Sequence, residues 1–418
     1  MLWLLAGARA CRTAHDCAYA GECVSGRCVC NAHWSGANCT VLNVRPAHAG
    51  GLRRTNSSSW GGSVVWDPDA RAWRMFFADM ELHCGLDTWK RNSRIGIATS
   101  ANATGPFTFD AGATANIAER SWSHNPTVHG PFTDPVPNAH STHQTTAKEG
   151  SSQVHLIYHI GRGRTSFFGL PRTDCTNGTT PRKRGAASSS TAAAAAVDDD
   201  GCPFCPLPVP PLTIPKRVQP SMLVSSQGLG GPWEEYRWDK IGWSCNNPAA
   251  VFLQNGTVIL ACKIFPAMGT DGKPWRQFGI FVAPTWRGPY EFRRLAPIFG
   301  EDAYIWHDPK ADGGTGAFKM LYHSMHNEHG PGKTCTTAWS KDGLEWTPNG
   351  NAGPPHPSPR ESYGLAIPLE GGGSLETARR ERHQPIFGPG GELVGLCNGV
   401  TTSRENDYSF TACVPVAQ

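Results

Sequence analysis

The sequence carries little charge for its length. Charged residues make up 17% of its 418 residues, and the net charge is only +4. A positive charge this small, spread along the whole chain, argues against nucleic acid as a partner. Beyond the first residues, the sequence also lacks any apolar run long enough to cross a bilayer as a helix, so we expect no transmembrane span.

Turn-forming, aromatic and cysteine residues are abundant instead. The chain has 47 glycines, 34 prolines and 15 tryptophans, a composition that favours an all-β fold. Its 15 cysteines predict disulfides, and therefore a secreted or extracellular protein. The N-glycosylation sequons agree with this prediction; they lie at Asn38, Asn56, Asn102, Asn177 and Asn255.

The first forty residues divide into two parts. The stretch MLWLLAGARA (1–10) is typical of the end of a secretory signal peptide, although it lacks a basic start; a truncated gene model is the alternative. The segment 11–39 is dense in cysteine, with the spacing C-x5-C-x5-C-x4-C-x-C-x8-C. So short a segment cannot bury a useful core, so disulfides must stabilise it, and spacing alone permits many pairings.

This cysteine spacing, with Trp34-Ser35-Gly36 before the last cysteine, resembles an EGF-like module. Such modules are usually spacers or protein-contact units, and the resemblance implies the pairs Cys11–Cys23, Cys17–Cys28 and Cys30–Cys39. The calcium-binding subtype needs an acidic cluster before the first cysteine. Ala8-Arg9-Ala10 supplies none.

The rest of the chain repeats one phrase, in which an apolar segment and a polar turn precede Gly-Pro-aromatic. Copies occupy 95–109, 222–236 and 279–292, with a degenerate fourth at 336–348. Two further short strands are expected upstream of each copy, and a fifth unit begins with QPIFGPGGELVGLCNGV. Five units of up to four strands predict a five-bladed β-propeller over 56–418.

The second unit is interrupted by 162–218, which is low in complexity and then rich in proline. We expect an inserted, largely disordered loop. Within it, Arg182-Lys183-Arg184 is an exposed basic run or a processing site. Cys202 and Cys205 have redox spacing without a strand–helix setting, which favours a plain disulfide. Nine cysteines lie outside the EGF-like module, so at least one is free or pairs between chains.

Aligning the starts of the first strands gives one polar stretch per blade. These stretches are Trp60-Gly61-Gly62, His124-Asn125-Pro126, Asn246-Asn247-Pro248, Glu301-Asp302-Ala303 and His383-Gln384-Pro385, the last preceded by Arg380-Glu381-Arg382. Because the inner strands of a propeller line its axis, their starts should ring one mouth, where a ligand would bind. In this alignment Glu301-Asp302 is the one acidic stretch.

These stretches, in the phrases WGGSVVWD, MELHCGLDTWKRNS, SHNPTV, EDAYIW and RERHQP, resemble glycoside hydrolase family 43 and its relatives over about 56–418. The resemblance implies cleavage of arabinose- or xylose-containing glycans by inversion, with an aspartate base in blade 1, an orienting aspartate and a glutamate acid. This sequence departs from that pattern. Gly61 and Gly62 replace the first aspartate, and blades 2 and 3 offer amides, which cannot abstract a proton. Hydrolysis would still need two carboxyl groups, about 6.5–9.5 Å apart for inversion.

The candidate catalytic residues are Glu301, Asp302, Glu381 and Glu81. Glu301 and Asp302 are adjacent on an extended strand, so their side chains diverge and we expect only one to face the channel. For Asp302 the alternative is a structural cap. Glu381 is either a carboxylate of the site or half of a surface salt bridge. Glu81 lies in a loop that would have to fold over the mouth, with His83, Cys84, Asp87, Trp89 and Arg91.

The candidate sugar-binding residues are His124, Asn125, Asn246, His323 and Arg382. A metal site would combine groups of the Glu81 loop with His124, His323 or His326, but scattered histidines are more often structural, so we expect no metal and no cofactor. Tryptophans flank the strand starts and either stack on sugar rings or pack inside the blades; they are Trp60, Trp122, Trp243 and Trp306.

Two functions fit these residues. The first is a secreted hydrolase that acts on plant- or algal-type cell-wall glycans at the propeller mouth. The second is a non-catalytic glycan-binding or adhesion protein, which keeps the sugar pocket without the base. In both, the partner is a carbohydrate, and the EGF-like module offers contact with another protein.

Overall fold

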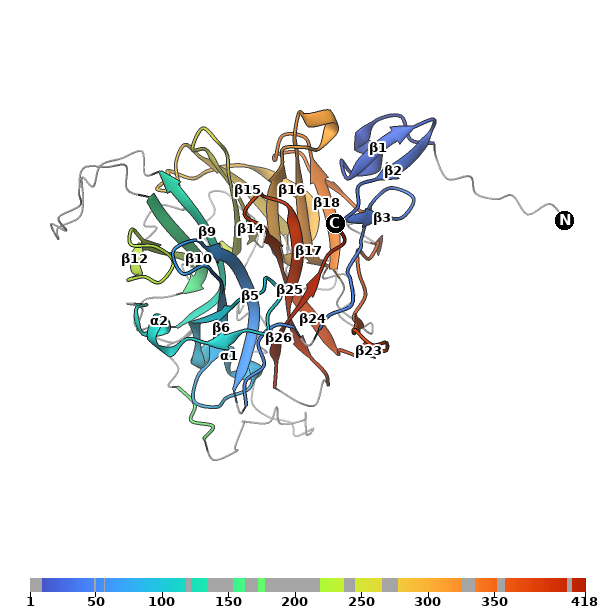
Figure 1. Cartoon of the computed structure of the whole chain (residues 1–418). Coiled ribbons are helices and arrows are strands. Elements are labelled where there is room, and N and C mark those ends of the chain that lie inside the picture. Colours follow the sequence, from blue (N-terminus) through green and yellow to red (C-terminus); the bar gives the residue numbers. More distant parts are fainter. Residues whose placement is uncertain are drawn as a thin grey trace, which may run out of the picture.

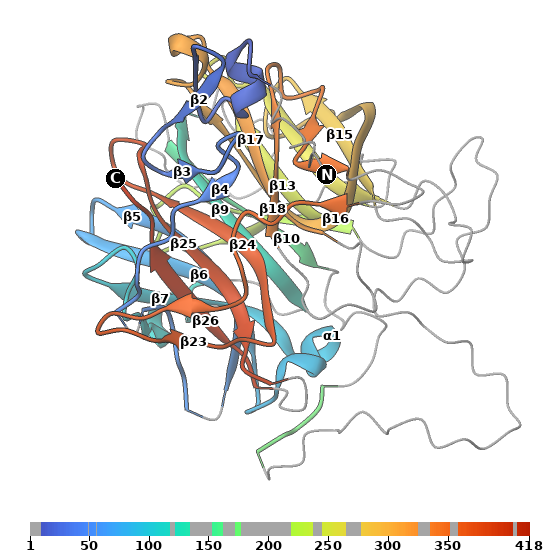
Figure 2. The same cartoon turned by 90° about the vertical axis from the view of Figure 1, so that its right-hand side faces the viewer.

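The computed structural model shows a chain built mainly of strands (Figures 1 and 2). The structure describes residues 10–48, 50–55, 57–117, 122–133, 153–161, 172–176, 219–236, 245–264, 277–324, 335–351, 358–403 and 408–418. Outside these ranges lie the candidate signal peptide except its last residue, most of the predicted insertion, and Cys202, Cys205, Trp243 and His326. Across the described ranges, no helix is long and apolar enough to span a membrane.

The N-terminal module contains η1 (Ala14–Cys17) and two small hairpins. The hairpins pair β1 (Gly21–Val24) with β2 (Arg27–Cys30) and β3 (Trp34–Ser35) with β4 (Val41–Leu42). Its disulfides are Cys11–Cys23, Cys17–Cys28 and Cys30–Cys39. This is the pairing that the EGF-like resemblance implied.

Five antiparallel blades follow. Blade 1 contains β5 (Ser58–Asp67), β6 (Ala72–Met80), β7 (Ser93–Ser100) and β8 (Thr108–Phe109). Blade 2 contains β9 (Ser123–Thr133), β10 (Gln153–Gly161), β11 (Gln219–Ser225) and β12 (Glu234–Tyr236). Blade 3 contains β13 (Asn246–Phe252), β14 (Val258–Ile264), β15 (Gln277–Ala283) and the first part of β16 (Glu291–Asp308).

The second part of β16 is the inner strand of blade 4. That blade continues with β17 (Ala317–Ser324), β18 (Cys335–Ser340) and β19 (Thr347–Pro348). Blade 5 contains β24 (Arg379–Phe387), β25 (Leu393–Thr401) and β26 (Phe410–Pro415). The remaining elements are short: η2 (Leu86–Thr88), α1 (Trp89–Asn92), α2 (Ala111–Ala115), η3 (Asp312–Gly314), β20 (Gly350–Asn351), β21 (Ser358–Pro359), β22 (Ile367–Pro368) and β23 (Ser374–Leu375).

The blades close into a ring through their inner strands. Strand β5 contacts both β24 and β9, and β16 contacts both β13 and β24. The ring is completed between β9 and β13, where Asn125 Nδ2 donates to Asn247 Oδ1 at 2.9 Å. The predicted five-bladed β-propeller is therefore the fold of the chain.

Each interface between neighbouring blades contains a buried apolar cluster. Phe76 of blade 1, for example, shares a cluster with Ile157 and Trp233 of blade 2. The second strands are buried on both faces, as in the run from Met75 to Ala78, which is why they are continuously apolar rather than alternating. This packing holds the inner strands in place around the axis.

The N-terminal module shares the core between blades 4 and 5. Trp34 and Cys39 of the module belong to the same buried cluster as Leu321 and Val400. The Lys319 ammonium, buried beneath the module, donates to the carbonyl oxygen of Ala18 at 3.1 Å. Figures 1 and 2 place the module and α1 at opposite ends of the propeller.

Three more disulfides lie in the propeller: Cys84–Cys175, Cys245–Cys262 and Cys397–Cys413. Cys397 and Cys413 face each other across β25 and β26. In the described part of the chain Cys335 is the free cysteine, and its side chain is buried. The odd count outside the module had predicted at least one such thiol or an intermolecular bond.

Candidate functional site

All five inner strands contain the same irregularity. In each, the pairing with the second strand slips by one residue. Glu301 pairs with His323, for example, but Tyr304 pairs with Leu321, so three residue steps on the inner strand face two on the second strand. This is a β-bulge with one extra residue, which bends the strand and re-aims its side chains. The first residue of each bulge has a positive φ: Gly61 (70°), Asn125 (54°), Asn247 (48°), Asp302 (55°) and Arg382 (55°). We call these five residues the axial ring.

Hydrogen bonds connect the axial ring from blade to blade. Asn247 Nδ2 donates to Asp302 Oδ1 at 2.7 Å, in addition to the bond from Asn125 to Asn247. The Arg382 guanidinium completes the ring. Its Nη2 donates to the Asn125 carbonyl oxygen at 2.7 Å, and its Nη1 lies 3.6 Å from Asp302 Oδ1. Non-glycine residues with positive φ are strained, and such residues cluster at functional sites.

Gly61 makes room for Arg382. A β-carbon at position 61 would lie 2.8 Å from Arg382 Cγ, which is closer than real contacts allow. Arg382 is fully buried and also donates to Thr127 Oγ1 at 2.9 Å. Its Nη2 is therefore bonded within the protein, and the role of Arg382 in sugar binding stays a prediction.

The residues directly before the axial ring are Trp60, His124, Asn246, Glu301 and Glu381. This register corrects the sequence alignment of blade 5, which placed His383-Gln384-Pro385 opposite the other stretches. Pro385 lies farther into its strand than Pro126 and Pro248 do, so the alignment on proline was wrong by two residues. Glu381 is consequently the blade 5 equivalent of Glu301, and the register has two acidic entries rather than one.

Glu301 is held by side chains from two blades. Lys263 Nζ, from β14 of blade 3, donates to Glu301 Oε2 at 2.6 Å. His323, the cross-strand partner of Glu301 on β17, has its Nδ1 3.6 Å from Glu301 Oε1. Asp302 instead accepts a hydrogen bond from Asn247, so the two adjacent acids have different partners.

Asp302, His323 and Glu381 lie close together. One donor atom of each lies within 4.8 Å of the other two, and all three residues are buried. Three such ligands could hold a divalent cation. We call Glu301, Asp302, Glu381 and His323 the acidic cluster. Burial raises the pKa of Asp302 to about 7; Arg382 opposes this shift, and the charges of Glu301 and Glu381 reinforce it.

His124 lies at the same end of the propeller, in an aromatic setting. Its ring stacks on Trp89 at 4.9 Å between centroids and on Trp122 at 6.2 Å. Its Nδ1 lies 2.8 Å from Ser93 Oγ. Burial lowers the pKa of His124 to about 3, so the imidazole is neutral at physiological pH and can exchange hydrogen bonds with a hydroxyl.

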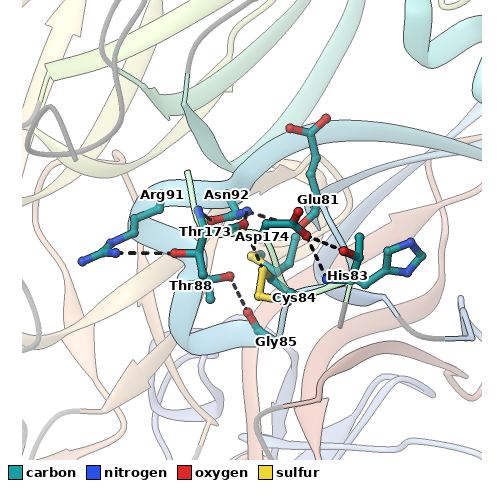
Figure 3. Close-up of a disulfide and its surroundings, with 12 residues drawn as sticks. Glu81, His83, Cys84, Gly85, Thr88, Arg91, Asn92, Thr173 and Asp174 are labelled. Carbon is teal, nitrogen blue, oxygen red and sulfur yellow. Dashed lines mark hydrogen bonds between the residues drawn. A yellow bond between two sulfur atoms is a disulfide. The ribbon is translucent and has the colours of Figure 1, made fainter. Parts of the chain in front are cut away.

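Glu81, in the loop after β6, is engaged by two arginines. Its carboxylate pairs with Arg94 Nε and Arg172 Nη1, each at 2.8 Å. Burial raises the pKa of Glu81, and the two arginines oppose that shift. Figure 3 shows this carboxylate turned away from the Cys84–Cys175 disulfide, which ties the Glu81 loop to residues 172–176. The geometry gives Glu81 an anchoring role in this loop.

Around that disulfide, the loop is further fixed by hydrogen bonds to Thr173. Asn92 Nδ2 donates to the Thr173 carbonyl oxygen at 2.7 Å, and the Thr173 amide donates to Asn92 Oδ1 at 3.1 Å (Figure 3).

Lys263 is the functional residue that sequence reasoning missed. A lysine inside the apolar run VILACKI is unusual, because a buried ammonium requires a partner. That signal was present in the sequence. The partner, Glu301, lies on another blade and could not be identified without the fold.

No protein-family model matches the sequence, and no curated protein sequence matches it significantly. Solved structures are similar at low identity. A family 117 glycoside hydrolase of the marine bacterium Zobellia galactanivorans has 12% identity and a TM-score of 0.47, over 90% of each chain. The endo-arabinase of Bacteroides thetaiotaomicron has 12% identity and a TM-score of 0.41, over 86% of this chain and 95% of its own.

Proposed function

We propose that this protein is a glycan-active hydrolase whose site is the acidic cluster at the starts of the inner strands. The observation that carries the proposal is the meeting of Asp302 and Glu381, two carboxyl groups from different blades, with an oxygen of each within 4.8 Å of the other. Paired carboxyl groups with separated roles are what glycoside hydrolysis requires. The resemblance of the sequence to family 43 agrees with this function.

Two of the acids have environments suited to different roles. Asp302, whose pKa burial raises to about 7, is partly protonated at neutral pH, and its protonated form would donate to the glycosidic oxygen. Glu381 would supply the carboxylate. Glu301, bonded to Lys263, would stay anionic and position His323.

The spacing of the pair favours retention over the inversion expected from the resemblance. The nearest donor atoms of Asp302 and Glu381 lie within 4.8 Å. An inverting pair is about 6.5–9.5 Å apart because a water molecule must fit, whereas a retaining pair is about 5–5.5 Å apart. In a retaining reaction, Glu381 would attack the anomeric carbon while Asp302 protonates the leaving oxygen. Water would then cleave the glycosyl ester with Asp302 as the base.

A non-catalytic glycan-binding protein is the second candidate. Asp302 Oδ1 accepts a hydrogen bond from Asn247 and lies beside Arg382, so this carboxyl group is also part of the axial ring. Glycine occupies the blade 1 position where the resemblance implies a base. Both features suit a pocket that binds a sugar without cleaving it, with His124 and Asn246 as hydrogen-bonding groups.

Turnover of arabinan, xylan and galactan oligosaccharides distinguishes the two. For the hydrolase we expect release of reducing ends, a loss of at least about 100-fold in Glu381→Gln, and no change in the exposed control Glu235→Gln. The anomer formed first, read by NMR, tests retention. Binding of an oligosaccharide by the wild type without any turnover would replace the hydrolase with the second candidate.

We further propose that the protein is secreted, with an EGF-like module over 11–39 and the propeller over 56–418. Six disulfides support an oxidising compartment. Three of the sequons lie in the described part of the chain, and of these Asn102 and Asn255 are exposed. Sensitivity of the secreted protein to an N-glycosidase, seen as a mobility shift, would test this proposal.

A further inference from the structure

A cavity lies at the end of the propeller where the inner strands finish, opposite the acidic cluster. Its volume is about 710 Å³, within the range of small-molecule sites. The aromatic residues that line it are Trp34, Phe132, Phe252, Tyr304, Trp306 and Phe387. We call it the basal pocket. It combines four inner strands of the propeller with one wall from the N-terminal module.

The basal pocket is separate from the acidic cluster. Along β16 the pocket is lined from Tyr304 to Asp308, whereas the acidic cluster uses Glu301 and Asp302, so no residue of this strand belongs to both. Between the two sets of residues lie the buried side chains of Ala303 on β16 and Ile386 on β24. The two sites therefore use different residues of the same strands.

Aromatic rings gather in two groups around the pocket. Phe132 and Phe252, from blades 2 and 3, stack with their centroids 4.0 Å apart. Tyr304, Trp306 and Phe387, from blades 4 and 5, lie within 6.3 Å of one another. All of these except Trp306 are only partly buried, so part of their surface faces the pocket.

Polar groups of several kinds interrupt the aromatic lining. Asn31, Gln254 and His307 offer neutral donors and acceptors, while Asp308 and Lys310 bring opposite charges. Burial lowers the pKa of His129 to about 3, which keeps its imidazole neutral. Its Nε2 has no hydrogen-bond partner among the described residues.

We propose that the basal pocket binds a short neutral oligosaccharide. Aromatic faces pack against the C–H faces of sugar rings, and dispersed amide and imidazole groups match their hydroxyls. Opposite charges at the rim do not select a cation or an anion, and the polar groups do not suit a purely apolar ligand. The module then has a defined role, because Trp34 and Asn31 complete the wall of the pocket.

The test locates binding on the full chain by photo-cross-linking. Xylotriose, maltotriose and galactotriose, each with a diazirine at the reducing end, are the probes, and labelled peptides are mapped by mass spectrometry. We expect at least one probe to label 129–132, 252–254, 304–308 or 387–392, with protection by the unmodified sugar. Labelling confined to other segments, or no protectable labelling by any probe, overturns the proposal whether or not the acidic cluster is catalytic.

Variants test the aromatic contribution. Phe252→Ala should weaken binding of the labelling sugar about tenfold by calorimetry, because one stacking face is lost. Phe109→Ala, a partly buried aromatic of blade 1 outside the pocket, is the matched control, and Gln254→Ala is a mild second variant at an exposed position. Equal binding by Phe252→Ala, Gln254→Ala and the control, or equal binding of charged trigalacturonate, contradicts a neutral-sugar site.

Discussion

Replacing Gly61 by alanine tests whether the Arg382 side chain packs tightly against Gly61 of blade 1. The new β-carbon would lie 2.8 Å from Arg382 Cγ, at a backbone φ of +70°. The positive φ alone costs roughly 1–2 kcal/mol for a residue with a β-carbon. Arg382 is fully buried and cannot swing into solvent, so the contact adds an overpacking cost of roughly 1–3 kcal/mol.

Gly313 provides the matched control. Its φ is +64°, and a β-carbon there would meet nothing within 4 Å. Gly313→Ala should therefore show the backbone cost alone, while Gly61→Ala should lose about 2 kcal/mol more in the free energy of unfolding. Urea unfolding followed by tryptophan fluorescence measures both. Equal losses in the two variants would refute the idea that Arg382 fits tightly against Gly61.

Three further predictions concern the same end of the propeller and use unfolding measurements. Burial raises the pKa of Asp302 to about 7, so the stability from its bound proton is complete below about pH 4 and is lost as the pH rises through 7. The free energy of unfolding of Asp302→Asn, relative to that of the wild type, should therefore rise by about 3 kcal/mol between about pH 5 and pH 8. A difference between variant and wild type that does not change with pH would contradict this. Lys263→Met should lower the free energy of unfolding by about 3–5 kcal/mol because Glu301 keeps a buried charge, and adding Glu301→Gln should recover most of that loss. Additive losses in the double variant would show that Lys263 and Glu301 do not stabilise each other. Removing the Cys84–Cys175 disulfide with two alanines should cost about 2–5 kcal/mol, and an unchanged midpoint would show that residues 172–176 do not restrain the fold.

The propeller could be predicted because its signals are local and repeated. Apolar strand pairs recur in all five units and the Gly-Pro turn in three, and Gly105-Pro106, Gly231-Pro232 and Gly288-Pro289 do precede outer strands. The axial ring had a partial signal. Glycine, asparagine and aspartate tolerate a positive φ, and they occupy four of its five positions.

The blade 5 register was missed because Arg382 gives no such signal. Arginine rarely adopts a positive φ, and it does so here because tertiary contacts to Asn125, Thr127 and Asp302 hold it. Gly300 lies where β16 passes from blade 3 to blade 4. Its β-carbon would lie 2.5 Å from the His323 carbonyl oxygen, so glycine allows close packing within a continuous β16.

The continuity of β16 places every member of the acidic cluster except Glu381 on one sheet. Blades 3 and 4 share this strand, so Lys263, Glu301 and His323 are carried by one hydrogen-bonded sheet of seven strands. Glu381 arrives on a separate sheet, joined to blade 4 through the short pairs β20–β21 and β22–β23. A displacement of blade 5 relative to blade 4 would therefore change the distance from Glu381 to Asp302 and leave the Lys263–Glu301 pair intact. The distance between these two acids therefore depends on how two sheets pack against each other.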